Sequence, residues 1–289
     1  MQICTYINRQ GQSITFSKSA PFVLRRIDPN SIGANAITSR AMSVDGHRTH
    51  GVTYNARTII LDIAITGQLN GRYDYQEYTK NWQRLCQIFD CKETGTLIYQ
   101  NDGGIYQIEC RLFELPNPIK HIGSTHICSL ELIADDPYWL SQIEFKHRLG
   151  HVIGGKKYPL RYPLQFGTWV KNAIVVNDQS RAIPLTVEIQ STALFITLIN
   201  ETTGEYLKVD TPLHENQKMI IWTGNDPYVL VQTFAAGELA SEEYANYKLD
   251  LDSKYFKLVP GINNITIDNG FPDITAAATV KYRKQYIGV

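Results

Sequence analysis

The sequence predicts a mainly β protein with two domains. Short runs of β-branched and aromatic residues recur along most of the chain, turn residues separate them, and only one segment has a helical apolar period. A length of 289 residues suits two domains of ordinary size. Glycine and proline cluster over residues 150–159, so we expect one domain over 1–145 and another over 146–289.

The composition excludes several classes of protein. Hydrophobic residues make up 43% of the chain and charged residues 19%, which supports a packed core and argues against disorder. The formal net charge is zero, whereas a dedicated nucleic-acid binder usually carries a basic surface. The first residues do not have the pattern of a signal peptide, and no apolar run approaches the ~20 residues of a membrane span. We therefore expect a protein made in the cytosol, with no membrane insertion.

The cysteines favour neither a disulfide framework nor a metal centre. All five lie in the first half of the chain, and none belongs to a C-x-x-C pair. Cys110 and Cys128 are expected to be small buried residues in strands. A zinc site is the alternative, but its spacing would match no usual ligand pattern; its ligands would be Cys86, Cys91, His47 and His50. No cofactor is expected.

The first domain is expected to be a β-sandwich or split barrel with a hairpin arm and one helix. Ile14-Thr15-Phe16 and Phe22-Val23-Leu24 have the composition of short strands. Residues 30–57 are polar and rich in turn residues, which indicates either a solvated loop or a hairpin arm. An arm would reach a neighbouring subunit or line a pore. Its candidate lumen-facing side chains are Arg40, Arg48 and Arg57.

A strand and then a helix follow the arm. Residues 59–66 alternate, which predicts one buried face made of Ile59, Leu61, Ile63 and Ile65. Asp74 is the expected N-cap of the helix, with Glu77 three residues later. An apolar stripe at spacings of three and four is expected to pack on the sheet; it consists of Tyr75, Tyr78, Trp82, Leu85 and Phe89. Gly95 is expected to end the helix.

The first domain closes with a hairpin and a strand that stops abruptly. Asn101-Asp102-Gly103-Gly104 is the expected turn between two apolar runs. The strand over 125–134 alternates and ends at Asp135-Asp136-Pro137-Tyr138-Trp139, where proline cannot donate to the ladder. Tyr138 and Trp139 are candidates for an interface with the second domain or with a partner. The alternative is that they cover the core of one domain.

The second half of the chain is almost entirely strand. Six short apolar runs between residues 173 and 267 are separated by turns at regular spacing, which is typical of a jelly roll or another β-sandwich. Residues 236–252 are more polar, and we expect an irregular surface excursion there. Tyr282 to Val289 supplies β-branched and aromatic side chains up to its last residue. We therefore expect it to be a strand of the second domain.

The sequence carries no legible catalytic motif. It has no P-loop, no G-x-S-x-G and no H-E-x-x-H. Its carboxylates are scattered, and nothing singles out a pair with the arrangement of a glycosidase. We expect that the protein is not an enzyme.

Four segments in this order carry a family resemblance. They are Asp135-Asp136-Pro137-Tyr138-Trp139, Asn200-Glu201-Thr202-Thr203-Gly204-Glu205-Tyr206-Leu207, Tyr255-Phe256-Lys257-Leu258-Val259-Pro260-Gly261-Ile262-Asn263-Asn264-Ile265 and Tyr282-Arg283-Lys284-Gln285-Tyr286-Ile287-Gly288-Val289. Each is weakly specific alone, but together, behind one amphipathic helix and a hairpin, they are fairly specific. The series resembles the distal tail protein (Dit) family of siphophages, especially those infecting Gram-positive bacteria. The resemblance covers nearly the whole chain.

The resemblance implies both a fold and a role. It implies an N-terminal ring-forming β domain and a C-terminal galectin-like β-sandwich. It further implies a homohexamer in the virion, at the baseplate hub of a phage tail tip, assembled in the host cytoplasm. Such a ring joins the tail tube protein to the tail-tip protein and to receptor-binding proteins used in host cell attachment. DNA passes through it as transient cargo during genome ejection.

The alternative function is a binding module whose second domain recognises cell-wall carbohydrate. Galectins bind sugar through a strand motif H-x-N-x-R and a tryptophan followed by glutamate. Here His214-Glu215-Asn216-Gln217-Lys218 has lysine in place of arginine, and Thr223 follows Trp222. A fold does not carry its function with it. An exposed groove lined by Trp or Tyr on one sheet would favour this alternative.

Overall fold

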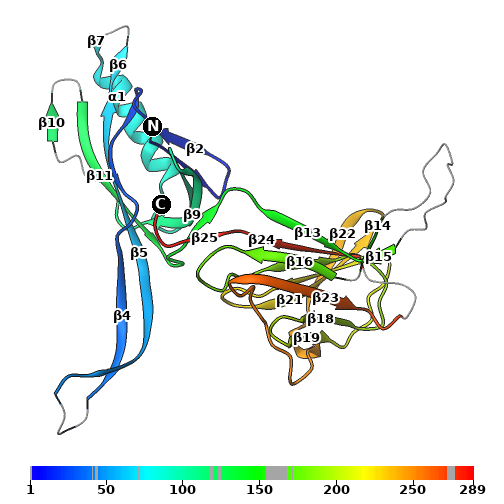
Figure 1. Ribbon diagram of the computed structural model, residues 1–289. Helices are drawn as coiled ribbons and strands as arrows, with labels where there is room; N and C mark the ends of the chain where they lie inside the picture. Colours follow the sequence, from blue (N-terminus) through cyan, green and yellow to red (C-terminus); the bar gives the residue numbers. More distant parts are fainter. Residues whose placement is uncertain are drawn as a thin grey trace, which may run out of the picture. The chain divides into compact units, whose positions relative to one another are not determined.

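The chain divides into two compact units in the computed structural model (Figure 1). The structure describes residues 2–40, 42, 45–69, 72–116, 120–122, 125–153, 168–170, 172–271 and 277–289. The first unit is Met1–Gln142 with Gln285–Val289, and the second is Ile143–Lys284. The polypeptide therefore passes between the units twice. This division differs from the expected one at the C-terminus, because the last five residues belong to the first unit.

A large antiparallel sheet forms the first unit. Its strands follow the order β2-β1-β8-β9-β11-β5-β3, and β4, β10, β12 and β25 pair at its margins. The elements of the unit are β1 (Ile3–Asn8), β2 (Ser13–Phe16), β3 (Phe22–Asp28), β4 (Ile32–Ser39), β5 (Arg48–Thr66), β6 (Gln68–Leu69), β7 (Arg72–Tyr73), α1 (Tyr75–Ile88), β8 (Gly95–Asn101), β9 (Gly104–Leu112), β10 (Lys120–Ile122), β11 (Thr125–Ala134), β12 (Trp139–Ser141) and β25 (Gln285–Tyr286).

Strands β5 and β11 form the centre of the first core. Their register places Leu61 opposite Leu130 and Ile63 opposite Cys128. All of the side chains predicted for the buried faces of these two strands are fully buried, which confirms the alternation (Ile59, Leu61, Ile63, Ile65, Cys128, Leu130 and Leu132). The expected hairpin is β8 and β9, and Asn101 Oδ1 holds its turn by accepting from the N–H groups of Gly103 and Gly104.

Helix α1 packs on this core through most of the predicted stripe. Asp74 caps the helix as predicted, since its carboxylate accepts from the N–H of Gln76 at 2.8 Å. Tyr78, Leu85 and Phe89 are buried, and Phe89 stacks on Tyr6 with ring centroids 4.2 Å apart. Trp82 is only half-buried, and Tyr75 is 66% exposed, so Tyr75 does not belong to the packing face. No helix in the described part of the chain is long and apolar enough to span a membrane.

Gly95 does not end the helix, contrary to the prediction. Helix α1 ends at Ile88, and Phe89, in extended conformation, is its C-cap. Gly95 instead begins β8, where an added Cβ would lie 2.5 Å from the ring of Tyr6. Close packing against Tyr6, rather than a left-handed backbone, therefore explains this glycine.

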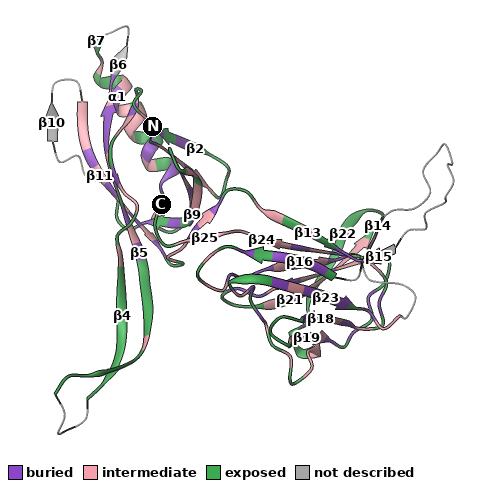
Figure 2. Cartoon of the chain, viewed as in Figure 1, coloured by how far each residue is buried: buried purple, intermediate pink, exposed green. Residues whose placement is uncertain are grey.

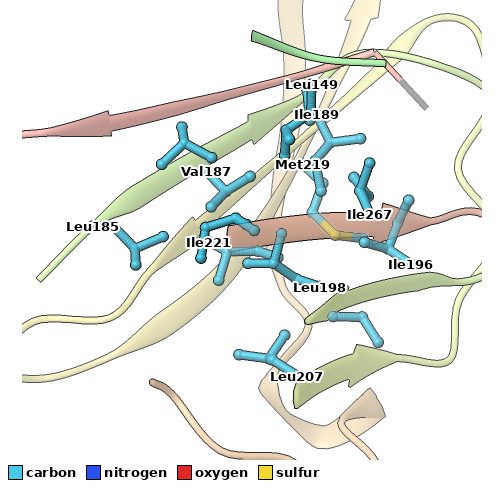
Figure 3. Close-up of a cluster of buried hydrophobic side chains, with 14 of the residues drawn as sticks. Leu149, Leu185, Val187, Ile189, Ile196, Leu198, Leu207, Met219, Ile221 and Ile267 are labelled. Atoms are coloured by element: carbon cyan, nitrogen blue, oxygen red, sulfur yellow. The ribbon is translucent and has the colours of Figure 1, made fainter. Parts of the chain in front are cut away.

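The second unit is a β-sandwich. A six-stranded sheet of order β13-β24-β17-β20-β21-β22 and a four-stranded sheet of order β16-β23-β18-β19 supply one shared core (Figure 3). The elements of this unit are β13 (Phe145–Leu149), β14 (His151–Ile153), β15 (Thr168–Val170), β16 (Asn172–Asn177), β17 (Thr186–Ile189), β18 (Ile196–Asn200), β19 (Glu205–Val209), β20 (Gln217–Trp222), β21 (Tyr228–Ala235), β22 (Glu238–Tyr244), η1 (Asn246–Lys248), β23 (Gly261–Asp268) and β24 (Ala278–Tyr282).

Two expectations for the second half are wrong. Part of the expected irregular excursion over 236–252 is a regular strand, β22, which pairs with β21 along its length. The final segment, Tyr282 to Val289, is not a single strand of the sandwich. Strand β24 ends at Tyr282 in the second unit, and β25 pairs with β12 in the first unit. A sequence pattern shows that a segment is extended but not which sheet it joins, which explains the second error; the polar composition of β22 explains the first.

Buried and exposed positions of helix α1 should differ in their effect on stability. Leu85→Ala should lower the free energy of unfolding by roughly 2–5 kcal/mol, because it leaves a cavity beneath α1. Tyr75→Ala, on the same helix but exposed, should change it by no more than about 0.5 kcal/mol. Urea unfolding of the purified variants measures both. Equal losses for the two variants would contradict the assignment of the packing face.

Candidate assembly interface: the hairpin arm and its base

An exposed hairpin arm extends from the large sheet of the first unit (Figure 1). Residues 48–56 of β5 pair only with β4, whereas residues 57–66 pair with β11 and residues 60–65 pair with β3 on their other side. Nearly every residue of the arm is exposed on both faces, in contrast to the rest of β5 (Figure 2). A two-stranded hairpin alone is marginally stable in water. An exposed hairpin of this kind is typical of an element that packs against a partner.

The two faces of the arm differ in chemistry. The pairs Ala34–Tyr54 and Ala36–Val52 lie opposite one another and make an apolar stretch on one face of the arm. Val52 is 60% exposed and Tyr54 is 42% exposed. The other face is mainly polar, and there Asn35 Nδ2 donates to Asn55 Oδ1 at 2.6 Å. The arm is thus an amphipathic ribbon whose apolar face has small side chains on β4 and larger ones on β5.

Arg57 anchors the base of the arm. Its side chain is fully buried, and its guanidinium donates to three backbone carbonyls: Nε to Pro137 at 2.6 Å, Nη1 to Pro29 at 2.7 Å and Nη2 to Ile287. Burial lowers the pKa of this guanidinium, but arginine keeps its proton in proteins. These three charge-assisted hydrogen bonds offset part of the cost of burying the cation. They join three segments that are far apart in the sequence.

Trp139 completes the same junction. It is fully buried in the first core, and its indole N–H donates to the carbonyl of Pro29 at 3.0 Å. The Pro29 carbonyl therefore accepts from both Trp139 and Arg57. Tyr138 is half-buried, and its ring meets Tyr54 at the root of the arm, edge to face, at 6.2 Å. The Asp135–Trp139 segment thus supports the arm.

The C-terminal residues lie against the same junction. Tyr286 is opposite Trp139 in the β12–β25 ladder and contacts Tyr106 at a ring distance of 5.1 Å. Val289 donates its N–H to Asn30 Oδ1 at 3.0 Å, and its carbonyl accepts from Asn30 Nδ2 at 3.2 Å. The end of the chain therefore stabilises the residues that lead into β4.

The structure separates the residues predicted for the site. Arg40 and Arg48 are exposed at the outer end of the arm, and their lumen-facing role stays a prediction. Arg57 is buried and cannot face a lumen, so its expected role was wrong. Trp139 is a core residue of the first unit. This agrees with the alternative, in which it covers the core of one domain, and not with an exposed interface.

Sequence reasoning missed the anchoring role of Arg57, although a signal for it exists. Arg57 is two residues before Ile59, so it has the inward-facing parity of the buried side of β5. A charged residue at such a position is almost never fully buried unless it has partners. The partners here are the backbone carbonyl groups of Pro29, Pro137 and Ile287. No pattern of side chains in the sequence predicts such partners.

The described residues contain no side-chain cluster suited to a metal ion. No group of three or more His, Cys, Asp or Glu side chains there could hold a metal ion. All five cysteines are free thiols. Burial raises the pKa of Cys4, Cys110 and Cys128 to about 12, which leaves their thiols protonated and poorly nucleophilic.

Two family models match the sequence, and together they cover most of it. The phage tail protein RIFT-related domain matches residues 9–124. The C-terminal domain of the siphovirus-type tail component matches residues 178–286. No curated protein matches the sequence.

Solved structures with this fold come from phage adsorption machinery. The crystal structure of SPP1 Dit, described as a paradigm of the hub adsorption apparatus in phages that infect Gram-positive bacteria, is 12% identical with a TM-score of 0.66; the match covers 98% of this chain and 99% of that one. Chains of the phage P2 baseplate in its activated conformation with Ca and with Sr are 11% and 12% identical. Both have a TM-score of 0.53 and cover 100% of this chain and 99% of theirs. At these identities the likeness shows the fold alone.

The Arg57 anchor predicts a large mutational effect. Arg57→Met should lower the free energy of unfolding of the first unit by roughly 2–4 kcal/mol, because the carbonyls of Pro137 and Ile287 lose this donor and Pro29 keeps only Trp139. This loss outweighs the saved cost of burying a cation. Arg48→Met, an exposed position on the same strand, should change it by less than about 0.5 kcal/mol. Urea unfolding measures the difference. A neutral Arg57→Met would show that the three carbonyls do not need this donor.

The C-terminal residues should stabilise the first unit and not the sandwich. Truncation after Lys284 removes β25 and the contacts of Val289 with Asn30. Amide hydrogen exchange should then accelerate in β12 and at residues 28–32, because these amides lose neighbours that exclude water. Exchange in β24 should stay as in the intact chain. Faster exchange in β24 with β12 unaffected would contradict the placement of the tail.

Proposed function

Because the chain belongs to the siphophage distal tail protein (Dit) family, we propose that six copies assemble into a closed ring at the phage tail tip. The family is that of a tail and baseplate hub, so the protein is a component of the virion tail. In the proposed ring the first unit makes the contacts between subunits. The ring joins the tail tube protein to the tail-tip and receptor-binding proteins. It is assembled in the host cytoplasm.

The single observation that carries the ring is the uncovered apolar face of the arm. Ala34, Ala36, Val52 and Tyr54 present this face at one side of a rigidly anchored hairpin. A head-to-tail contact needs a different patch on the neighbouring copy, and such contacts form a ring when the rotation between copies closes. The first unit also exposes Phe113 and Leu115, at 58% and 59%, just after β9. We assign this apolar pair as the receiving patch for the arm of the next copy.

The charges of the arm suit a channel that passes DNA without holding it. Arg40 and Arg48 are the candidate lumen-facing residues. Arg57 is not a candidate, because its side chain is buried. Tight binding to duplex DNA requires many clustered Lys and Arg contacts and shows a steep salt dependence. The chain has 28 basic and 28 acidic residues, so DNA is a transient cargo in this proposal. The role of the protein is positional rather than catalytic.

The ring itself can be tested directly. Native mass spectrometry and negative-stain electron microscopy of the purified full chain should give a hexamer with a central opening. The small contact area of a single arm makes assembly concentration-dependent, so the measurement should extend to at least tens of micromolar. A monomer or a two-fold dimer throughout that range would contradict the ring.

The arm gives a matched pair of variants for the same assay. Val52→Asp places a carboxylate on the apolar face and should shift the population from ring to monomer, because an unpaired charge would be buried at the contact. Thr53→Asp places the same group on the opposite face, at the next residue of the strand, and should leave the ring intact. Both positions are exposed, so neither should change the melting temperature by more than about 2 °C. Equal effects from the two would sink the proposed face.

A further inference from the structure

The outer face of the six-stranded sheet carries an aromatic strip. Alternation along β20 buries Met219 and Ile221 in the sandwich and leaves Ile220 and Trp222 on the outer face. Strands β21 and β22 add residues of the same face beside them. We define the strip as Ile220, Trp222, Tyr228, Leu230 and Tyr244.

The strand register makes the strip continuous. Trp222 lies directly opposite Tyr228, and Ile220 lies directly opposite Leu230, which in turn lies opposite Tyr244. Directly opposed residues on one face have Cβ atoms about 4.5–5.5 Å apart, so these side chains touch. The rings of Tyr228 and Tyr244 meet edge to face with centroids 5.9 Å apart. The strip therefore presents three aromatic rings across three neighbouring strands.

Trp222 is held in place by the turn that follows it. Its indole N–H donates to the carbonyl of Asn225 at 3.2 Å. A Cβ on Gly224 would lie 2.2 Å from the indole, so the ring covers this glycine closely. Thr223 fixes this turn, because its buried hydroxyl accepts from the N–H of Leu185 at 3.0 Å. A ring fixed in this way loses little conformational entropy when a ligand stacks on it.

Polar side chains in hydrogen-bonded pairs border the strip. Lys218 and Gln232 form the next opposed pair along the same strands, and Gln232 donates to Glu242 at 2.6 Å. On the other side of β20, Glu188 accepts from Lys281 at 2.5 Å and lies 3.1 Å from Lys218. Burial opposes ionisation of Glu188, but hydrogen bonds from both lysines outweigh it and keep the pKa of this carboxyl below its ordinary value. Donors and acceptors thus lie in the row beside Ile220, Leu230 and Tyr244, at one end of the strip.

We propose that this strip and its polar border are a saccharide-binding face. A pyranose ring has an apolar C–H face that stacks on an aromatic ring and a rim of hydroxyls that both donate and accept. Trp222, Tyr228 and Tyr244 provide the stacking surfaces. Glu188, Lys218, Gln232 and Glu242 provide the acceptors and donors at the rim. The ligand class is an oligosaccharide long enough to cross three strands.

The exposed area favours a saccharide over a protein partner. Four of the five strip residues are half-buried, and only Tyr244, at 65%, is widely exposed. A stable protein interface removes about 800 Å² per partner and 20–30 residues from water. Five side chains that are mostly sunk into the sheet offer far less, but they match the width of a few sugar rings. The inference does not depend on the ring proposed above, because the strip lies wholly in the second unit.

Binding of defined saccharides to the full chain tests the face. The probes are soluble hexasaccharides of glucose, galactose, mannose, rhamnose and N-acetylglucosamine, titrated by calorimetry. At least one should bind with a Kd below about 1 mM. Trp222→Ala and Tyr244→Ala should each weaken that binding about tenfold or more. The matched control is Ile174→Ala, which removes an exposed apolar side chain (61%) from the other sheet of the same sandwich and should bind as wild type.

Tyr244→Ala keeps the test sound if Trp222→Ala disturbs the sandwich, because Tyr244 is widely exposed and its loss leaves the core intact. Circular dichroism and melting temperature establish folding for each variant. The proposal is overturned if no hexasaccharide binds the wild type up to about 10 mM. It is also overturned if folded Tyr244→Ala binds normally. Loss of attachment to another tail protein in the strip variants, with no saccharide bound by the wild type, would assign the face to a protein partner instead.

Discussion

The hydrogen bonds of the buried Arg57 guanidinium join the base of the arm, the segment before β12 and the C-terminal residues of the first unit. Arg57 is the residue of β5 at which the buried half of the strand meets the exposed arm. Its three acceptors come from the turn into β4, from the segment before β12 and from the C-terminal residues. Neutral donors would need three side chains to satisfy three carbonyls in different directions, whereas the planar guanidinium has five N–H groups in a fixed fork. The direction of the arm and the path of the tail are consequently set at one point.

Local patterns predicted the cores well because each depends on one strand or one helix. The alternation of β5 and β11 is a property of consecutive residues, and burial followed it without exception at the predicted positions. The helix stripe failed at Tyr75, in the first turn, and held only in part at the half-buried Trp82. Arg57 and β25 could not be predicted in the same way. Their partners are backbone groups at 28 to 230 residues' separation, and side-chain patterns contain no information about such partners.

The aromatic strip shows the same limit in the second unit. The sequence places Trp222 four residues after an incomplete sugar motif and gives no reason to connect it with Tyr228 or Tyr244. That connection arises from the hairpin register of β20 with β21 and from β22, a strand that composition had predicted to be irregular. The charged residues of β22 suit its position at the edge of the sheet, where they discourage pairing with another chain. Charge composition alone therefore concealed a regular strand.

The apolar face of the arm and the aromatic strip differ in a way that indicates different occupants. On the arm, Val52 is 60% exposed, and its neighbours on β4 are alanines that allow a backbone to approach closely. While it is uncovered, such a surface exposes much apolar area to water. Another polypeptide is broad enough to cover it. On the sandwich, Trp222 is half-buried, fixed by Asn225, and surrounded by paired donors and acceptors. That surface needs no cover to be stable. A small polar ligand with one apolar face can therefore bind and leave without any change in the fold, whereas the apolar face of the arm becomes covered in the proposed ring.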